Sequence, residues 1–334
     1  MKAALLEQAG PIENKPLQLR EVAEPTPSAT QVVIKVGACG VCRSNLHMVE
    51  GDWLPNTPAS FPIIPGHEVA GTVSAVGSAV THLAVGDRVG VQPIWKTCGV
   101  CEYCFSGREQ LCRQRQITGE TLDGGYAEYM LAESAYTYPL PDNISFTEAA
   151  PLFCPGITAY GSVAKAHLTP GQKVAVLGIG GVGHMVIQMA ALTGADVYAV
   201  TRSAVHQAVA EELGAVKSFS PKGSDGSNLS DNAMDAAIVF APSDASVAEA
   251  MRVVKPGGRI VLGVAQNVGL LDIGDERTVV GSVLGNRQQM REVLNLAAAG
   301  KLRSVHADFP LAEANEVLGM LKNGEIRARA VLVP

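Results

Sequence analysis

The sequence predicts an α/β protein with two domains, a small β-barrel followed by a parallel, doubly wound sheet. Its 334 residues suit about two domains of roughly 150 residues each. In the first half, proline and glycine interrupt short valine-rich segments at nearly every interval, as is typical of a small all-β barrel. From about residue 147 onward, apolar strands alternate with helical segments, which is the pattern of a parallel sheet.

Each expected element has a local signal. In the first half, alternating or valine-rich strands are expected at 31–40, 67–77, 86–95 and 124–133. In the second half, strands are expected at 173–177, 197–200, 234–241, 259–264 and 278–285, and helices at 184–192, 205–215 and 246–258. The tail, with helices near 287–299 and 311–322 and a final strand, matches neither pattern, so we expect it to return to the first domain.

Composition and charge exclude several classes of protein. Hydrophobic residues make up 47% of the chain and charged residues 17%, which does not fit a disordered protein. The net charge is −6 and basic residues do not cluster, so a nucleic-acid partner is not expected. No apolar run reaches the ~18 residues of a membrane span. The first residues lack the apolar stretch of a signal peptide, and we therefore expect a cytoplasmic protein.

Four of the seven cysteines lie within fifteen residues as C-x2-C-x2-C-x7-C; they are Cys98, Cys101, Cys104 and Cys112. Thiolates at this spacing can converge on one tetrahedral zinc ion. With no open ligand position among them, the expected site is closed and structural. Inert buried thiols and an iron–sulfur cluster are the alternatives, although the C-x3-C-P continuation of bacterial clusters is absent.

A second set of metal-ligating residues is dispersed along the chain. Cys42, His67 and Cys154 would give zinc three protein ligands and leave the fourth position for water or substrate, which is the arrangement of a catalytic zinc. Each residue alone is weak evidence, because a lone cysteine is usually a small core residue.

A glycine-rich turn follows the strand at 173–177 and opens the next helix; its residues are Gly178, Ile179, Gly180, Gly181, Val182 and Gly183. In this context GxGxxG predicts a dinucleotide site, with the pyrophosphate at the helix N-terminus. The next strand ends in Thr201, Arg202 and Ser203 rather than in a carboxylate. Hydroxyls and a guanidinium suit a 2′-phosphate, so NADP(H) is favoured, with NAD(H) as the alternative.

Taken together, these motifs resemble those of the zinc-dependent medium-chain alcohol dehydrogenase family. The resemblance extends over almost the whole chain in order: GVCRSNLH, PGHEVAG, the four-cysteine lobe, the cysteine before GITAY, GIGGVGH and the terminal RAVLV. It implies a GroES-like β-barrel catalytic domain interrupted by a Rossmann domain. The expected boundaries are 1–154 (zinc-binding lobe 95–115), 155–284 and 285–334.

The resemblance assigns the catalytic zinc to Cys42, His67 and Cys154, and it makes Glu68 a carboxylate that approaches the metal in some states. Two zinc ions per chain are therefore expected, one catalytic and one structural. Zinc would lower the alcohol pKa, and hydride would pass between the substrate and the nicotinamide.

The resemblance also implies roles for residues around this centre. Ser44 is expected to take the substrate proton and His47 to end the relay to solvent. Arg43 and Arg329 are expected to contact the cofactor pyrophosphate, and Val264 to line the cofactor site. The substrates would be alcohols, especially primary ones, including aromatic or medium-chain alcohols, together with the corresponding aldehydes and ketones, and the protein a homodimer or homotetramer.

The chain departs from the family pattern at three positions. Asn45 stands where the family usually has an aspartate behind the ligand histidine, which predicts an altered zinc affinity or pH optimum. Thr201 replaces a frequent aspartate, and His206 a frequent lysine, on the adenosine side of the cofactor. Trp53 and Trp95 are expected to line the substrate pocket, with plain packing as the alternative.

Two other functions remain open. A zinc-free quinone or enoyl reductase on the same fold normally lacks both cysteine sets. A non-catalytic redox or zinc-responsive regulator would not need Ser44 and His47. Metal content distinguishes these alternatives from an alcohol dehydrogenase.

Overall fold

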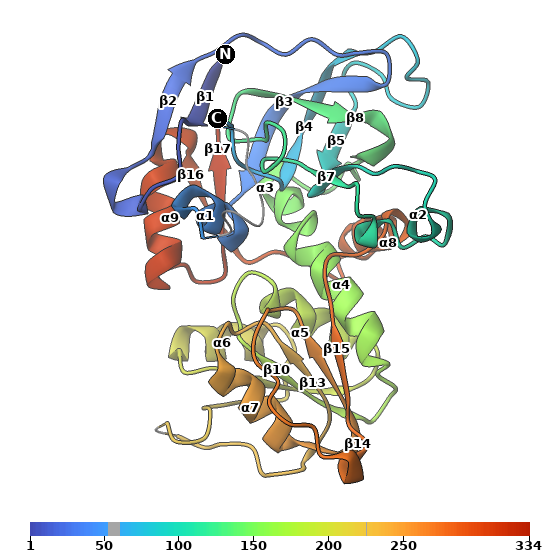
Figure 1. The fold of residues 1–334 in the computed structure, drawn as a ribbon, viewed down its shortest axis with the longest axis vertical. Coiled ribbons are helices and arrows are strands. Elements are labelled where there is room, and N and C mark those ends of the chain that lie inside the picture. Colours follow the sequence, from blue (N-terminus) through green and yellow to red (C-terminus); the bar gives the residue numbers. More distant parts are fainter. Residues whose placement is uncertain (53–60, 225) are drawn as a thin grey trace. The chain divides into compact units, whose positions relative to one another are not determined.

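The computed structural model describes residues 1–52, 61–224 and 226–334, which form two compact units (Figure 1). Unit 1 comprises Met1–Cys154, Asn286–Ala299 and Ser304–Pro334, and unit 2 comprises Pro155–Gly285 and Gly300–Arg303. The end of the chain therefore belongs to the same unit as its beginning.

The described part of unit 1 is built around a seven-stranded sheet in the order β16-β17-β3-β4-β5-β9, with β8 paired to β3. Its strands are β3 (Gln31–Gly40), β4 (Val69–Val76), β5 (Arg88–Val91), β8 (Tyr129–Glu133), β9 (Thr137–Pro139), β16 (His306–Pro310) and β17 (Arg329–Val333). Pairings are antiparallel except between β16 and β17. Along β3, Val32, Val33, Ile34 and Val36 are buried while Lys35 is exposed, so most of this strand lies within the core.

Smaller elements complete unit 1. The two-stranded sheets pair β1 (Lys2–Leu6) with β2 (Leu17–Glu21), and β6 (Ile94–Lys96) with β7 (Gln116–Ile117). The helices are α1 (Arg43–Glu50), α2 (Glu102–Phe105), α3 (Phe146–Ala149), α8 (Arg287–Ala298) and α9 (Ala314–Asn323). Short 3-10 helices lie at Ile12–Asn14, Glu109–Leu111, Ser134–Tyr136, Ala150–Leu152 and Leu311–Glu313.

The described part of unit 2 contains a six-stranded, wholly parallel sheet in the order β12-β11-β10-β13-β14-β15. Its strands are β10 (Lys173–Leu177), β11 (Asp196–Val200), β12 (Lys217–Phe219), β13 (Met234–Val239), β14 (Val254–Leu262) and β15 (Thr278–Gly281). Helices α4 (Pro155–Ala166), α5 (Gly183–Ala191), α6 (Ala204–Glu212) and α7 (Asp244–Val253) pack against it, and a 3-10 helix lies at Ile273–Asp275 (Figure 1). This strand order, with reversal beside β10, is that of a Rossmann sheet, and it confirms the predicted fold class.

One predicted helix was too long. The expected helix at 246–258 ends at Val253, and β14 begins at Val254. Pro256 disfavours a helical conformation at Lys255, and Gly257 has a φ of 74°, so the chain continues in extended form.

Across the described residues, no helix has both the length and the apolar composition needed to span a bilayer.

Candidate functional site

The pairing of β3 with β4 places Cys42 and His67 close together in unit 1. The strands are antiparallel with Cys39 opposite Val69, and the Gly40 N–H donates to the Glu68 carbonyl at 2.8 Å. Cys42 lies two residues after β3, and His67 lies two residues before β4. The end of one strand and the start of its neighbour therefore meet at the same edge.

Cys154 reaches this edge through its neighbour Phe153. The Phe153 side chain is fully buried and packs on Gly90 of β5, where an added Cβ would stand 2.0 Å from the ring. This close contact holds the segment against the sheet. As a result the Cys154 and Cys42 sulfur atoms lie 3.8 Å apart, although 112 residues separate them.

The donor atoms of this group suit a zinc ion. One ligand atom from each of Cys42, His67, Glu68 and Cys154 lies within 4.8 Å of all the others. Two thiolates bound at about 2.3 Å to one tetrahedral zinc ion stand roughly 3.8 Å apart, which matches the sulfur–sulfur distance. The predicted ligands therefore converge, and the soft sulfur and imidazole donors fit zinc.

A buried ion pair borders the group. Arg329 of β17 pairs with Glu68, and both side chains are almost completely buried. The Arg329 Nε donates to Glu68 Oε2 at 3.2 Å. The pKa of the Cys42 thiol is held well below its usual value by the hydrogen bond with Cys154, and then by Arg329 and His67, which together outweigh its burial. Thiolate is the form that binds a metal.

Two further polar side chains, Asn45 and Glu120, lie near Nδ1 of His67, and Tyr126 is hydrogen-bonded to Asn45. Asn45 is fully buried, and its Nδ2 lies 3.4 Å from His67 Nδ1. The Tyr126 hydroxyl donates to Asn45 Oδ1 at 3.3 Å. Glu120 Oε1 lies 3.7 Å from His67 Nδ1, and burial raises the pKa of Glu120 to about 6. Sequence reasoning missed Glu120 and Tyr126, because no local motif marks a contact made by a distant turn.

Helix α1 carries the three residues expected to serve proton transfer and cofactor binding. Ser44 Oγ lies 3.3 Å from His67 Nε2, and His47 follows one turn later, on the same helix face. The partly exposed His47 pairs through Nδ1 with Asp52 Oδ2 at 2.6 Å. Arg43 is exposed and donates to the Leu321 carbonyl at 3.1 Å.

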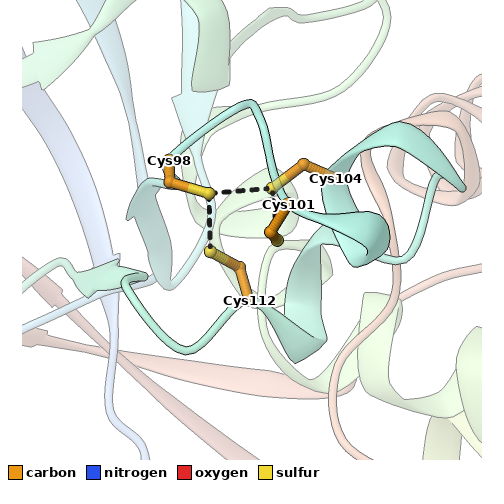
Figure 2. A group of neighbouring side chains, drawn as sticks. All are labelled: Cys98, Cys101, Cys104 and Cys112. Carbon is orange, nitrogen blue, oxygen red and sulfur yellow. Dashed lines mark hydrogen bonds between the residues drawn. The ribbon is translucent and has the colours of Figure 1, made fainter.

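The four cysteines of the lobe also converge (Figure 2). Their sulfur–sulfur distances are 3.9 Å between Cys98 and Cys104, 3.5 Å between Cys101 and Cys104, and 3.6 Å between Cys112 and Cys98. A hydrogen bond from the Val100 backbone leads the interactions that lower the pKa of Cys98 to about 6. Four thiols at this spacing fit a closed tetrahedral zinc site.

In unit 2, the glycine turn brings strand β10 and helix α5 close together. Gly178 follows β10 with a φ of 91°, and a Cβ on Gly183 would stand 2.0 Å from the Gly178 carbonyl, so strand and helix can approach only without side chains there. A Cβ on Gly180 would meet no atom within 4 Å. Gly181 and Val182 complete the turn before α5, whose N-terminus favours an anion.

The tip of β11 carries hydroxyls and a cation. Thr201 Oγ1 accepts from the Ser203 N–H at 3.3 Å, and Ser203 caps α6 by accepting from the His206 N–H. Arg202 between them is exposed, and Val264, after β14, is half-buried.

Only one of the two tryptophans expected to line the substrate pocket lies in the described part of the chain. Trp53 lies outside the described residues. Trp95 of β6 is buried, and its indole N–H points to the Leu131 carbonyl at 3.5 Å.

Comparisons with known proteins identify the family to which this chain is related. The family model "Alcohol dehydrogenase GroES-like domain" matches residues 28–142, and "Zinc-binding dehydrogenase" matches residues 181–299. An alcohol dehydrogenase of Geobacillus stearothermophilus is 40% identical, and the match covers 99% of each chain. The crystal structure of an Aeropyrum pernix alcohol dehydrogenase superposes with a TM-score of 0.91 at 32% identity, covering 100% of both chains.

A cobalt- and zinc-bound thermostable alcohol dehydrogenase of Pyrobaculum aerophilum has a TM-score of 0.89 at 30% identity, with 100% of this chain and 99% of that chain covered. The family matches lie in both units, and the likeness to these relatives extends over essentially the whole chain. The chain therefore belongs to the zinc-dependent medium-chain alcohol dehydrogenase family.

Proposed function

We propose that the chain is an NAD(P)-dependent alcohol dehydrogenase whose catalytic zinc is held by Cys42, His67 and Cys154. The observation that supports this most directly is the 3.8 Å separation of two cysteine sulfurs that the sequence keeps more than a hundred residues apart. Bound there, zinc supplies a Lewis acid that lowers the pKa of the substrate hydroxyl. The nicotinamide supplies the hydride acceptor or donor.

Three side chains around the proposed zinc site would transfer the substrate proton or lie beside the metal. Ser44 Oγ, 3.3 Å from His67 Nε2, is placed to accept the hydroxyl proton of a bound alcohol. His47 is partly exposed and hydrogen-bonded to Asp52, so it can pass a proton to solvent. Glu68 accepts a hydrogen bond from Arg329, and its carboxylate would be available as a further ligand to the metal.

Cys98, Cys101, Cys104 and Cys112 hold a second, structural zinc in this proposal. The test is metal analysis of the purified protein joined to an activity screen. Alcohols and aldehydes are assayed with NAD(H) and NADP(H), before and after treatment with a chelator. Two zinc ions per chain and chelator-sensitive turnover are expected. One zinc or none, or full turnover by metal-free protein, would favour the zinc-free reductase and contradict the proposal.

The cofactor is proposed to be NADP(H) in preference to NAD(H). Exposed Arg202, between the Thr201 and Ser203 hydroxyls, can present a planar fork of donors to the 2′-phosphate. Arg202→Ala is therefore expected to raise the KM for NADP(H) about tenfold, as the loss of a charged hydrogen bond of about 1.5 kcal/mol would, and to change that for NAD(H) little. Steady-state kinetics with both cofactors measures this. Equal effects on both cofactors would show that Arg202 does not read the phosphate.

Primary alcohols, including aromatic or medium-chain ones, and their aldehydes are the proposed substrates, and Trp95 the proposed wall of their pocket. Trp95→Phe is expected to lower kcat/KM for aromatic relative to small aliphatic alcohols about tenfold, within the range for reshaping an apolar pocket. The ratio of the two rates is the measurement, because it cancels any loss of folded enzyme. An unchanged ratio would assign Trp95 to packing alone.

The assembly is proposed to be a homodimer or homotetramer in the cytoplasm, acting on small molecules and not on nucleic acid or membranes. Light scattering of the purified protein during gel filtration tests the oligomeric state, and a monomeric mass would contradict it.

A further inference from the structure

His67 needs a hydrogen-bond acceptor on the side away from the metal site. Its Nε2 faces the donor cluster, with Glu68 Oε1 at 3.9 Å and Ser44 Oγ at 3.3 Å. A neutral histidine that ligates a metal through one ring nitrogen carries its proton on the other. If Nε2 binds zinc, as the proposed function requires, Nδ1 is therefore a donor.

Asn45 is the nearest polar side chain to Nδ1, but it presents the wrong atom. Its Oδ1 already accepts from the Cys42 N–H at 3.2 Å and from the Tyr126 hydroxyl at 3.3 Å. These two bonds orient the amide so that Nδ2, a donor, stands 3.4 Å from His67 Nδ1. Turning the amide over would bring its NH2 group against the Cys42 N–H, which can only donate, so the observed orientation, with a donor toward His67, is the favoured one.

Glu120 provides a carboxylate on this side. Its Oε1 lies 3.7 Å from His67 Nδ1, and its side chain is only 12% exposed. The turn that carries Glu120 is packed tightly on the segment before His67. Gly119 has a φ of 68°, and a Cβ there would stand 2.6 Å from the Gly66 nitrogen. The Gly124 N–H donates to the Ile64 carbonyl at 2.7 Å, so both ends of the turn are held.

We propose that Glu120 is a positioning residue for the zinc site, and that its carboxylate orients His67 by attracting the Nδ1 proton and makes the imidazole a stronger ligand. Carboxylate partners of metal-bound histidines act in this way. Here the carboxylate comes from a turn more than fifty residues away, while the buried neighbour on α1 is an amide. Glu120 is not one of the four residues of the donor group, so its proposed role is exerted through His67.

The test compares zinc affinity among four proteins by competition with a chromogenic chelator: the wild type, Glu120→Gln, the double variant Glu120→Gln/Asn45→Asp, and the control Glu249→Gln. In Asn45→Asp an oxygen replaces the nitrogen that stands 3.4 Å from Nδ1, which restores an acceptor by another route. Glu249 is a buried carboxylate paired with Arg252 in unit 2, so the control removes a buried negative charge remote in sequence from the zinc ligands. Circular dichroism verifies that each protein is folded.

We expect Glu120→Gln to bind the zinc ion assigned to Cys42, His67 and Cys154 about 10- to 100-fold less tightly, the range found for outer partners of metal ligands. The zinc affinity of the double variant should recover to within a few-fold of the wild-type value, and the affinity of the Glu249→Gln control should equal the wild-type value. Wild-type affinity in Glu120→Gln, or no recovery in the double variant, would overturn the proposal. If the Cys154→Ser variant had the same zinc content as the wild type, that result would instead contradict the zinc assignment on which the proposal rests.

Discussion

Replacing Cys154 with serine is expected to lower kcat/KM for alcohol oxidation by about a thousand-fold or more, because the Lewis acid contributes several kcal/mol to the transition state. Cys154 and Cys42 form the close sulfur pair of the proposed site. A serine hydroxyl has nearly the same size but does not ionise near neutral pH and is a poor zinc ligand. Metal analysis should show that one zinc ion of two is lost, and steady-state kinetics gives the loss of rate.

The matched control for this experiment is Cys39→Ala. Cys39 lies in the same unit, is buried, and is outside the donor group. Burial raises its pKa, so it remains a thiol and packs as a small apolar side chain. The control should keep both zinc ions and most of the activity. If Cys154→Ser retained wild-type turnover, the catalytic role of this site would be refuted.

Replacing Cys112 with serine is expected to unfold the zinc-binding lobe locally. The lobe has little apolar packing of its own: α2 has four residues, none of them buried, and Val100 and Phe105 are 72% and 79% exposed. Metal binding must therefore supply much of the free energy that orders this segment. The zinc content should fall from two ions to one, and proteases should cut within residues 95–115 at least about tenfold faster, since local opening governs cleavage.

Mass spectrometry of the fragments locates the cleavage, and Cys39→Ala again serves as the control. Loss of zinc with no change in the cleavage rate would show that the lobe is ordered by the protein alone. Retention of two zinc ions by Cys112→Ser would remove Cys112 from the ligand set.

Much of unit 2 could be predicted because its signals are local. The apolar strand at 173–177, the glycine turn and the following helix are contiguous, and the structure has them as β10, the turn and α5. The same reasoning extended α7 too far, because the steric effect of Pro256 and the extended pairing of β14 with β13 outweigh helical periodicity. Strand β16 carried no clear pattern, since its stability depends on pairing with β17.

The two proposed zinc sites differ in how far their ligands could be predicted from local sequence. Four cysteines at two- and seven-residue spacing can close on one ion within a single segment, so their convergence follows from chain geometry alone. Cys42, His67 and Cys154 carry no such local information, so residue chemistry alone made them weak candidates and the resemblance to a family strengthened the assignment. Their meeting depends on the pairing of β3 with β4 and on the packing of Phe153 against Gly90.

Residue identity along the chain was thus enough to predict the sheet type and the glycine turn after β10, and to favour zinc at the four-cysteine lobe. Folding determined which distant groups share one donor cluster, why Asn45 offers His67 an amide nitrogen, and that the nearby carboxylate belongs to Glu120. The physical reason is that periodicity and spacing reflect only contacts between residues a few positions apart. The environment of a buried imidazole is instead set by backbone pairings and close packing between segments far apart in the chain.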